Sequence, residues 1–154
     1  MPEMSFTTLL TVRIGSMSFS AVLESERAPR TAAAFQARLP FEGQLVQARW
    51  SGEAGWIPLA DYDLGVAHEN ATSYPAPGQV LWHPPGLSEA ELLVPYGSTC
   101  FSSRVGQLAG NHFLTIRDEH GDLAEVGRRL LHDGAQLIRF ELTATGHGAV
   151  PEFT

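Results

Sequence analysis

The chain has 154 residues, of which 44% are hydrophobic, and this suffices for a single domain with a substantial core. Its formal net charge of −7, with ten dispersed arginines and no lysine, argues against nucleic acid as a partner, because phosphate binding needs clustered cations. Cys100 is the only cysteine, which excludes an intrachain disulfide and a multi-cysteine zinc site.

The first predicted element is a β-hairpin. Leu10, Val12 and Ile14 alternate with polar residues, and the same period of two continues over residues 17–23 after the turn residues Gly15-Ser16. Both strands therefore have one apolar and one polar face, as is typical of an antiparallel sheet.

A short amphipathic helix follows, beginning at Pro29, which suits a first helical turn. Thr31, Phe35 and Leu39 recur at helical spacing, and Thr31 is close enough to the start to help cap it. Pro40 ends the helix.

A period of two returns in residues 44–50. Val46, Ala48 and Trp50 share one face, which we expect to be the core face, and Arg49 points to the opposite one. Further strands are expected at 56–59, 78–82, 90–96 and 111–116.

The second predicted helix spans residues 121–134, with Asp122 as its cap and Gly134 as its end. Its apolar stripe consists of Leu123, Val126, Leu130 and Leu131. A last strand is expected at 135–143. The total is about eight strands and two helices without regular alternation, which predicts a mainly β fold: a closed antiparallel barrel capped by two helices.

Three segments in the same order resemble the cyclophilins: "SERAPRTAAAFQARL" in the first helix, "YPAPGQVLW" before a central strand, and "GNHFLTI" before a late strand. The resemblance covers roughly residues 7–144, and it implies one cyclophilin-like domain over residues 1–154. The chain is still more similar to an uncharacterised bacterial family of cyclophilin-like proteins, in which segments like "ARWSGE" and "GQVLWHPPG" recur.

The resemblance implies two catalytic positions. Arg49 matches the catalytic arginine of the strand after the first helix, and His112 matches the histidine of the Gly-x-His segment. The Phe-Met-x-Gln run of the cyclophilins is replaced here by "EAGWIP", so their proline pocket is incomplete. A degenerate peptidyl-prolyl isomerase is therefore an alternative function rather than the first choice.

The proline-stiffened segment 68–86 is expected to form a binding rim, since polar loops on a rigid barrel often carry function. A cleft would lie between Arg49, residues 68–77 and residues 110–113. Arg49 would bind an anion or a carbonyl group, and His112 would donate a hydrogen bond or transfer a proton. The predicted ligand-binding residues are Arg49, His68, Glu69, Tyr74, Trp82, His83, Tyr96, Asn111 and Phe113, with Tyr74 and Trp82 as apolar walls.

Other chemistry has little support. The histidines at 68, 83 and 112 lack metal-ligand spacing, so neither a metal nor another cofactor is predicted, and Cys100 is expected to be a spectator thiol. The function expected is binding of a small molecule or short peptide. A second alternative is an oligomeric assembly module whose outward aromatics pack on another subunit.

The N-terminal residues lack the basic region and apolar stretch of a signal peptide, and no segment approaches the roughly 20 apolar residues of a membrane helix. A lone cysteine suits a reducing compartment. We therefore expect a cytoplasmic protein without a membrane partner.

Overall fold

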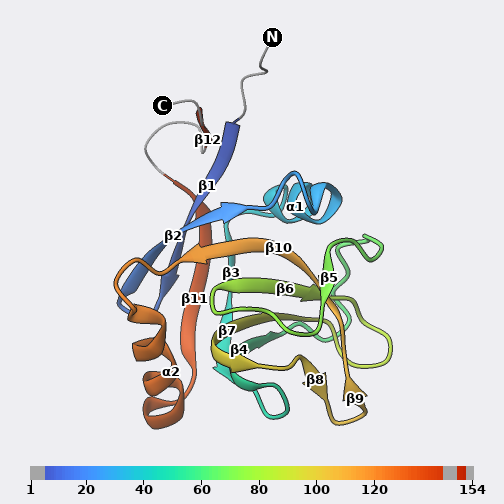
Figure 1. Cartoon of the computed structure of the whole chain (residues 1–154), viewed down its shortest axis with the longest axis vertical. Helices are drawn as coiled ribbons and strands as arrows, with labels where there is room; N and C mark the ends of the chain where they lie inside the picture. Colours follow the sequence, from blue (N-terminus) through green and yellow to red (C-terminus); the bar gives the residue numbers. More distant parts are fainter. Residues whose placement is uncertain (1–5, 144–148, 152–154) are drawn as a thin grey trace.

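Eight strands close into an antiparallel barrel in the computed structural model, which describes residues 6–143 and 149–151 (Figure 1). Around the barrel they follow the order β11, β3, β4, β7, β6, β10, β2 and β1, and β1 pairs back with β11. Their bounds are β1 (Phe6–Ile14), β2 (Met17–Leu23), β3 (Phe41–Gln47), β4 (Gly52–Pro58), β6 (Gln79–His83), β7 (Glu91–Thr99), β10 (Gly110–Arg117) and β11 (Gln136–Leu142).

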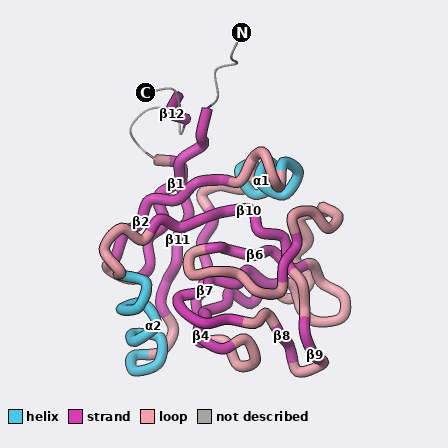
Figure 2. Tube along the Cα trace, viewed as in Figure 1, coloured by secondary structure: helices cyan, strands magenta, loops and turns pink. Residues whose placement is uncertain are grey.

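Four shorter strands lie outside this ring. β5 (Ala71–Thr72) pairs with β10, and β12 (Ala149–Pro151) pairs with the start of β1. β8 (Ser102–Ser103) and β9 (Gly106–Gln107) form a separate two-stranded hairpin. The helices are α1 (Pro29–Gln36) and α2 (Asp122–Asp133), and Figure 2 shows that strand and loop make up most of the remaining chain. The predicted mainly β barrel with two helices is thus confirmed.

The predicted hairpin is β1 and β2, joined at Gly15, whose φ of +59° favours glycine. The buried faces of both strands are the predicted ones, with Leu10, Val12 and Ile14 at most 1% exposed. Because β1 also pairs with β11 along Leu10 to Ile14, this hairpin closes the barrel.

Aromatic rings fill the barrel interior beneath α1. Phe35 of α1 lies 4.9 Å from Phe113 and 5.3 Å from both Phe41 and Phe140, measured between ring centroids. Such tilted and edge-on contacts are favourable beyond the area that they bury. The helix thus covers one side of the barrel, and Figure 1 shows it on the side opposite α2.

α2 is capped differently from the prediction. The carboxylate of Asp118 accepts the backbone N–H groups of Asp122 (2.6 Å) and Leu123 (3.1 Å), while Gly121 occupies the N-cap position. Leu131 is 62% exposed, and the buried positions of α2 are Leu123, Val126, Gly127 and Leu130. The loop aspartate reaches two free N–H groups at once, which an aspartate inside the first turn cannot do.

A second apolar cluster lies on the outside of the barrel wall. Along β6, Val80 and Trp82 belong to the interior, whereas Leu81 belongs to the outer cluster. The members of the outer cluster are Ala54, Leu81, Leu93, Phe101 and Leu108. Phe101 and Leu108 flank the β8–β9 hairpin, which therefore covers the wall and leaves β6 and β7 buried on both faces.

The expected faces of β3 are reversed. Leu45 is fully buried in the interior, while Val46 pairs with Trp56 and Ala48 packs against the outer cluster. β3 ends at Gln47, so Trp50 lies beyond the strand and is 57% exposed rather than in the core. Alternation alone does not say which face is the inner one when both faces have apolar neighbours. Among the described residues, no helix is long and apolar enough to cross a membrane.

Candidate functional site

A cavity of about 280 Å³ opens on the outer wall of the barrel. It lies between the turn from β3 to β4, the segment that leads into β7, and the β8–β9 hairpin. Its lining residues are Ala48, Arg49, Trp50, Ser51, Trp56, Ser88, Glu89, Glu91, Ser102, Ser103 and Arg104. The lining is mainly polar, with four serines, two arginines and two glutamates, and two tryptophans supply its aromatic part.

Two arginines from different loops face this cavity. Arg49 follows β3, and Arg104 is in the turn of the β8–β9 hairpin. Both are exposed, and neither forms an ion pair or a hydrogen bond with any described residue. Their guanidinium donors are therefore free for a ligand, and their planar fork matches a carboxylate.

Glu91 and His83 form a buried polar pair on the same wall. They are register partners at the adjoining ends of β7 and β6, and directly opposite residues of an antiparallel pair project to the same face. Glu91 is 6% exposed and lines the cavity, and His83 is 7% exposed. The His83 ring lies edge-on to Phe101 at 5.7 Å, and its Nδ1 atom has no partner in hydrogen-bonding geometry within the described chain.

Both members of the pair are neutral near pH 7. Burial raises the pKa of Glu91 to about 8, and the negative charge of Glu89 contributes in the same direction. Burial and then the charge of His68 lower the pKa of His83, against the opposing effect of the Pro84 and Glu89 backbone. Glu91 therefore presents a carboxylic acid to the cavity, which can donate a hydrogen bond or release a proton.

Ser51 fixes the shape of the cavity wall. Its Oγ accepts the N–H of Ser102 at 3.0 Å and donates to the Ser102 carbonyl at 3.1 Å. The Cys100 N–H also donates to the Ser51 carbonyl, at 3.1 Å. These contacts hold the base of the β8–β9 hairpin against the β3–β4 turn, so the two arginine-bearing loops keep their relative position.

Glu69 and Asn111, both predicted to bind a ligand, are occupied with each other and with α1. The Glu69 carboxylate accepts from the backbone N–H (2.6 Å) and the hydroxyl (2.7 Å) of Thr31, and Asn111 Nδ2 donates to the Thr31 hydroxyl at 3.0 Å. The Glu69 N–H completes the set by donating to Asn111 Oδ1 at 3.2 Å. The network joins the loop before β5 to α1 and β10.

His112 belongs to a third group of side chains. Its Nε2 lies 2.8 Å from the Thr115 hydroxyl, which itself donates to Glu24 at 2.6 Å. Since that hydroxyl has one proton, His112 must be the donor in its own contact with Thr115. Burial lowers the pKa of His112, an effect that Glu24 opposes and Arg27 reinforces.

The remaining predicted ligand-binding residues are dispersed. Trp82 and Phe113, 1% and 0% exposed, lie inside the barrel, because the outward positions of β6 are those of Leu81 and His83. Tyr74 is 67% exposed and donates its hydroxyl proton to Gln107 at 3.2 Å.

Tyr96 donates its hydroxyl proton to Gln47 at 2.7 Å and packs on α2, where a Cβ at Gly127 would overlap its ring. His68 is exposed on the loop before β5. Neither residue lines the cavity beside Arg49.

The predicted grouping of site residues is therefore only partly present. Arg49 lines the cavity and His83 lies beside Glu91, but no residue of 68–77 or 110–113 is in the cavity lining. Sequence reasoning missed Arg104, Glu89 and Glu91. The available signal was Glu91, a lone charge next to the apolar run of the predicted strand 90–96. Within residues 6–143 and 149–151, no three His, Cys, Asp or Glu side chains gather as a metal site.

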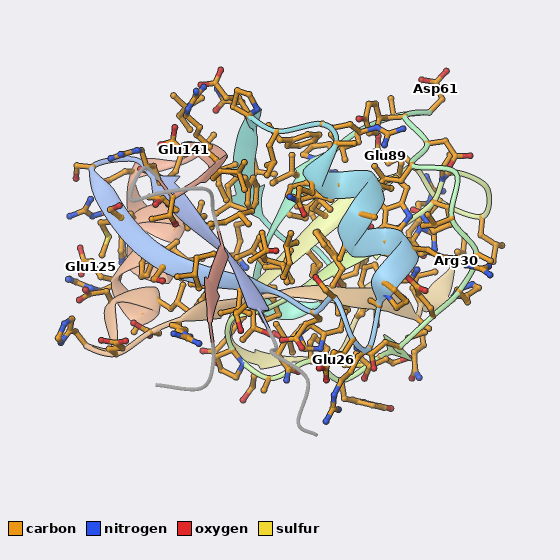
Figure 3. The ribbon with its side chains drawn as sticks, turned by 90° about the horizontal axis from the view of Figure 1, so that it is seen from above. Glu26, Arg30, Asp61, Glu89, Glu125 and Glu141 are labelled. Atoms are coloured by element: carbon orange, nitrogen blue, oxygen red, sulfur yellow. The ribbon has the colours of Figure 1, made fainter. Side chains whose placement is uncertain are left out.

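Figure 3 places this region within the molecule. Seen from above, Glu89 and Asp61 lie on the opposite side from Glu125, which belongs to α2. Glu125 is engaged by Arg128 and Arg129 of its own helix. The acidic side of the cavity is thus remote from α2 and its ion pairs.

Comparisons with known proteins describe the fold more than the chemistry. Residues 10–142 match the model of a family described as "Protein of unknown function (DUF3830)". The comparison with curated proteins gives no match.

Two of the matching solved structures illustrate the shared fold. The structure of McbB in complex with tryptophan is 19% identical, with a TM-score of 0.66 over 90% of this chain and 45% of McbB, so the chain spans less than half of McbB. The solution structure of the hypothetical protein AF2241 from Archaeoglobus fulgidus is 22% identical, with a TM-score of 0.55 over 88% of this chain and 94% of that protein.

Proposed function

This chain belongs to the DUF3830 family of proteins of unknown function, and we propose that it binds a small organic carboxylate in the cavity between Arg49 and Arg104. The observation that supports this most directly is the pair of unpaired guanidinium groups at a cavity of about 280 Å³. Two cations in one recess on a chain of net charge −7 repel each other mildly, and an anion between them removes that repulsion.

Other arginines of the chain show the contrast. Arg13 pairs with Glu141 at 2.7 Å, and Arg139 pairs with Glu42 at 2.7 Å. Arg49 and Arg104 face a cavity that also contains Glu89 and Glu91, yet neither arginine makes such a pair there. A bidentate carboxylate from outside the chain would supply the missing partner.

The aromatic lining suggests the rest of the ligand. Trp50 is 57% exposed, and Trp56 packs against the outer cluster with part of its surface facing the cavity. An apolar or aromatic group on the ligand would pack against these rings, and the apolar surface buried there would contribute to the binding free energy. We therefore favour carboxylates that carry an aromatic or branched apolar group.

Prolyl isomerisation fits the cavity less well. Four serines and two glutamates line it, whereas a proline ring requires an apolar pocket beside the arginine. The isomerase hypothesis stays a prediction, which a protease-coupled isomerisation assay tests. The cyclophilin likeness, the cytoplasmic location and a homo-oligomer likewise stay predictions, and size-exclusion chromatography tests the last of these.

The test is a thermal-shift and calorimetry panel of 3-phenylpropionate, indole-3-propionate and 4-methylpentanoate, each beside its uncharged amide. Tryptophan is added because the McbB structure contains it. We expect at least one carboxylate to raise the melting temperature and its amide not to do so. The double variant Arg49→Ala/Arg104→Ala should abolish the shift, because both cations are lost.

Arg30→Ala is the matched control. Arg30 is exposed, belongs to α1 and not to the cavity lining, and has no ion pair in the described chain. Its variant should bind as the wild type does. Binding that survives in the double variant, or a panel in which every acid fails, would contradict the proposal.

A further inference from the structure

The cavity also contains an acid that lacks a partner. Glu91 is 6% exposed, and its carboxyl group forms no hydrogen bond or ion pair with any other described residue. Its carboxyl oxygens are not among the fully enclosed side-chain atoms that lack a partner in the described chain, so they are open to the cavity, where water or a ligand can bond to them. Glu91 lines a cavity, and the missing partner can therefore be a ligand.

The charges of the cavity are divided between its two sides. Arg49 and Arg104 come from the β3–β4 turn and the β8–β9 hairpin, and Glu89 and Glu91 come from the segment that leads into β7. A molecule with a negative and a positive group at neighbouring positions matches this division better than a simple anion, which offers no cation to Glu89 or to an ionised Glu91.

We propose that the ligand is an amino acid or a similar zwitterion, whose carboxylate binds Arg49 and Arg104 and whose ammonium group binds Glu91. This rests on the proposed function, because the carboxylate is held by the same two arginines. Trp50 and Trp56 would contact the apolar side chain of the ligand.

Binding of this kind releases a proton. The free protein holds Glu91 as a carboxylic acid at pH 7, since burial raises its pKa to about 8. An ammonium group against Glu91 favours the carboxylate, and the acid proton leaves for the solvent while the ammonium keeps all of its own. The ion pair between the ammonium group and the Glu91 carboxylate compensates for the loss of the Glu91 proton, and about one proton is released to the solvent for each ligand bound.

The groups that face Glu91 set the conditions for this exchange. His83 lies directly across on β6, Glu89 lies two residues away on the same segment, and the two arginines line the opposite side of the cavity. On β4 the register partner of Glu91 is Pro58, which carries no charge. His83 is buried and its pKa is lowered, so at pH 7 it accepts the released proton less readily than the phosphate or Tris buffer does.

The experiment is isothermal titration calorimetry at pH 7 in two buffers with different ionisation enthalpies, such as phosphate and Tris. The probes are matched pairs that differ only in the amine: tryptophan with indole-3-propionate, phenylalanine with 3-phenylpropionate, and leucine with 4-methylpentanoate. We expect one amino acid to bind roughly tenfold or more tightly than its partner acid, and to release about one proton where the partner releases none.

Glu91→Gln separates this inference from the proposed function. The variant should lose both the proton release and the preference for the amine, while its affinity for the partner acid stays unchanged. Glu26→Gln is the matched control, because Glu26 is exposed and lies away from the labelled Glu89 (Figure 3).

If the partner acids bind as well as the amino acids and no proton is released, the zwitterion inference is wrong and the carboxylate proposal stands. If neither member of any pair binds, the carboxylate proposal itself fails.

Discussion

Replacing Glu91 by Gln should remove a pH dependence of stability that lies between about pH 4.5 and 8. In the unfolded chain this carboxyl ionises at its ordinary pKa of 4.5, whereas burial raises the pKa in the folded protein to about 8. Below the lower value both states are protonated. Above it the unfolded state gains by ionising and the folded state does not, so the free energy of unfolding falls as the pH rises.

The magnitude follows from the two pKa values. Each pH unit in this interval is equivalent to about 1.4 kcal/mol, so the whole interval lowers the free energy of unfolding by about 5 kcal/mol, and about 3 kcal/mol of this is lost by pH 7. Gln has nearly the same shape and does not ionise. For a chain of this size, about 3 kcal/mol corresponds to a melting temperature roughly 6–12 °C higher for the variant at pH 7.

Urea unfolding of both proteins at pH 5, 6, 7 and 8 measures the difference directly. The stability of Glu91→Gln relative to the wild type should increase by about 1.4 kcal/mol per pH unit, as the wild type loses stability. Glu26→Gln, an exposed substitution, should give a flat difference. A flat difference for Glu91→Gln as well would show that Glu91 ionises normally in the folded protein and would refute the reasoning.

Three further substitutions test how the barrel, the Thr31 network and the cavity wall are held. Gly78→Ala should lower the free energy of unfolding by about 3 kcal/mol, since the φ of Gly78 is +88° and a Cβ would lie 2.5 Å from a backbone oxygen. Gly65→Ala should lower it by only about 1 kcal/mol, because Gly65 has a similar φ of +76° but no atom near its Cβ position. Equal losses of the two variants in urea unfolding would contradict this reasoning. Thr31→Val should lower the free energy of unfolding by about 1–3 kcal/mol, because it removes the hydroxyl that bonds to Glu69 and Asn111. Thr31→Ser keeps a hydroxyl and should restore most of this loss, as measured by thermal unfolding. Ser51→Ala should speed exchange of the Ser102 amide hydrogen while the global stability falls by no more than about 2 kcal/mol; an unchanged exchange rate would show that this contact does not hold the hairpin.

The strands and helices that sequence reasoning predicted correctly are those with one buried face and one solvent-exposed face. Leu10, Val12 and Ile14 alternate cleanly because the outer face of β1 is exposed to solvent, so the period of two also identified the inner face. The helix around Phe35 was found for the same reason, since its apolar positions recur at helical spacing on one side. Local patterns were sufficient wherever burial was one-sided.

The candidate site lies where burial is two-sided, and there the pattern failed. In β6 both Leu81 and Trp82 are buried, so nothing local shows that Leu81 faces out and Trp82 faces in. The outward-facing Leu81 is buried because Phe101 and Leu108, at least 20 residues further along the chain, pack over it. Arg49 was selected by resemblance, but its neighbour Arg104 is brought to it only by this long-range packing.

The outer cluster divides the protein into two separately packed parts. The barrel interior contains no residue from 100 to 109, so insertions or exchanges within the β8–β9 hairpin do not require the interior to be repacked. A family built on this plan can diversify the molecules it recognises by altering one short, surface-mounted segment. Natural selection for binding and natural selection for foldability then act on different residues.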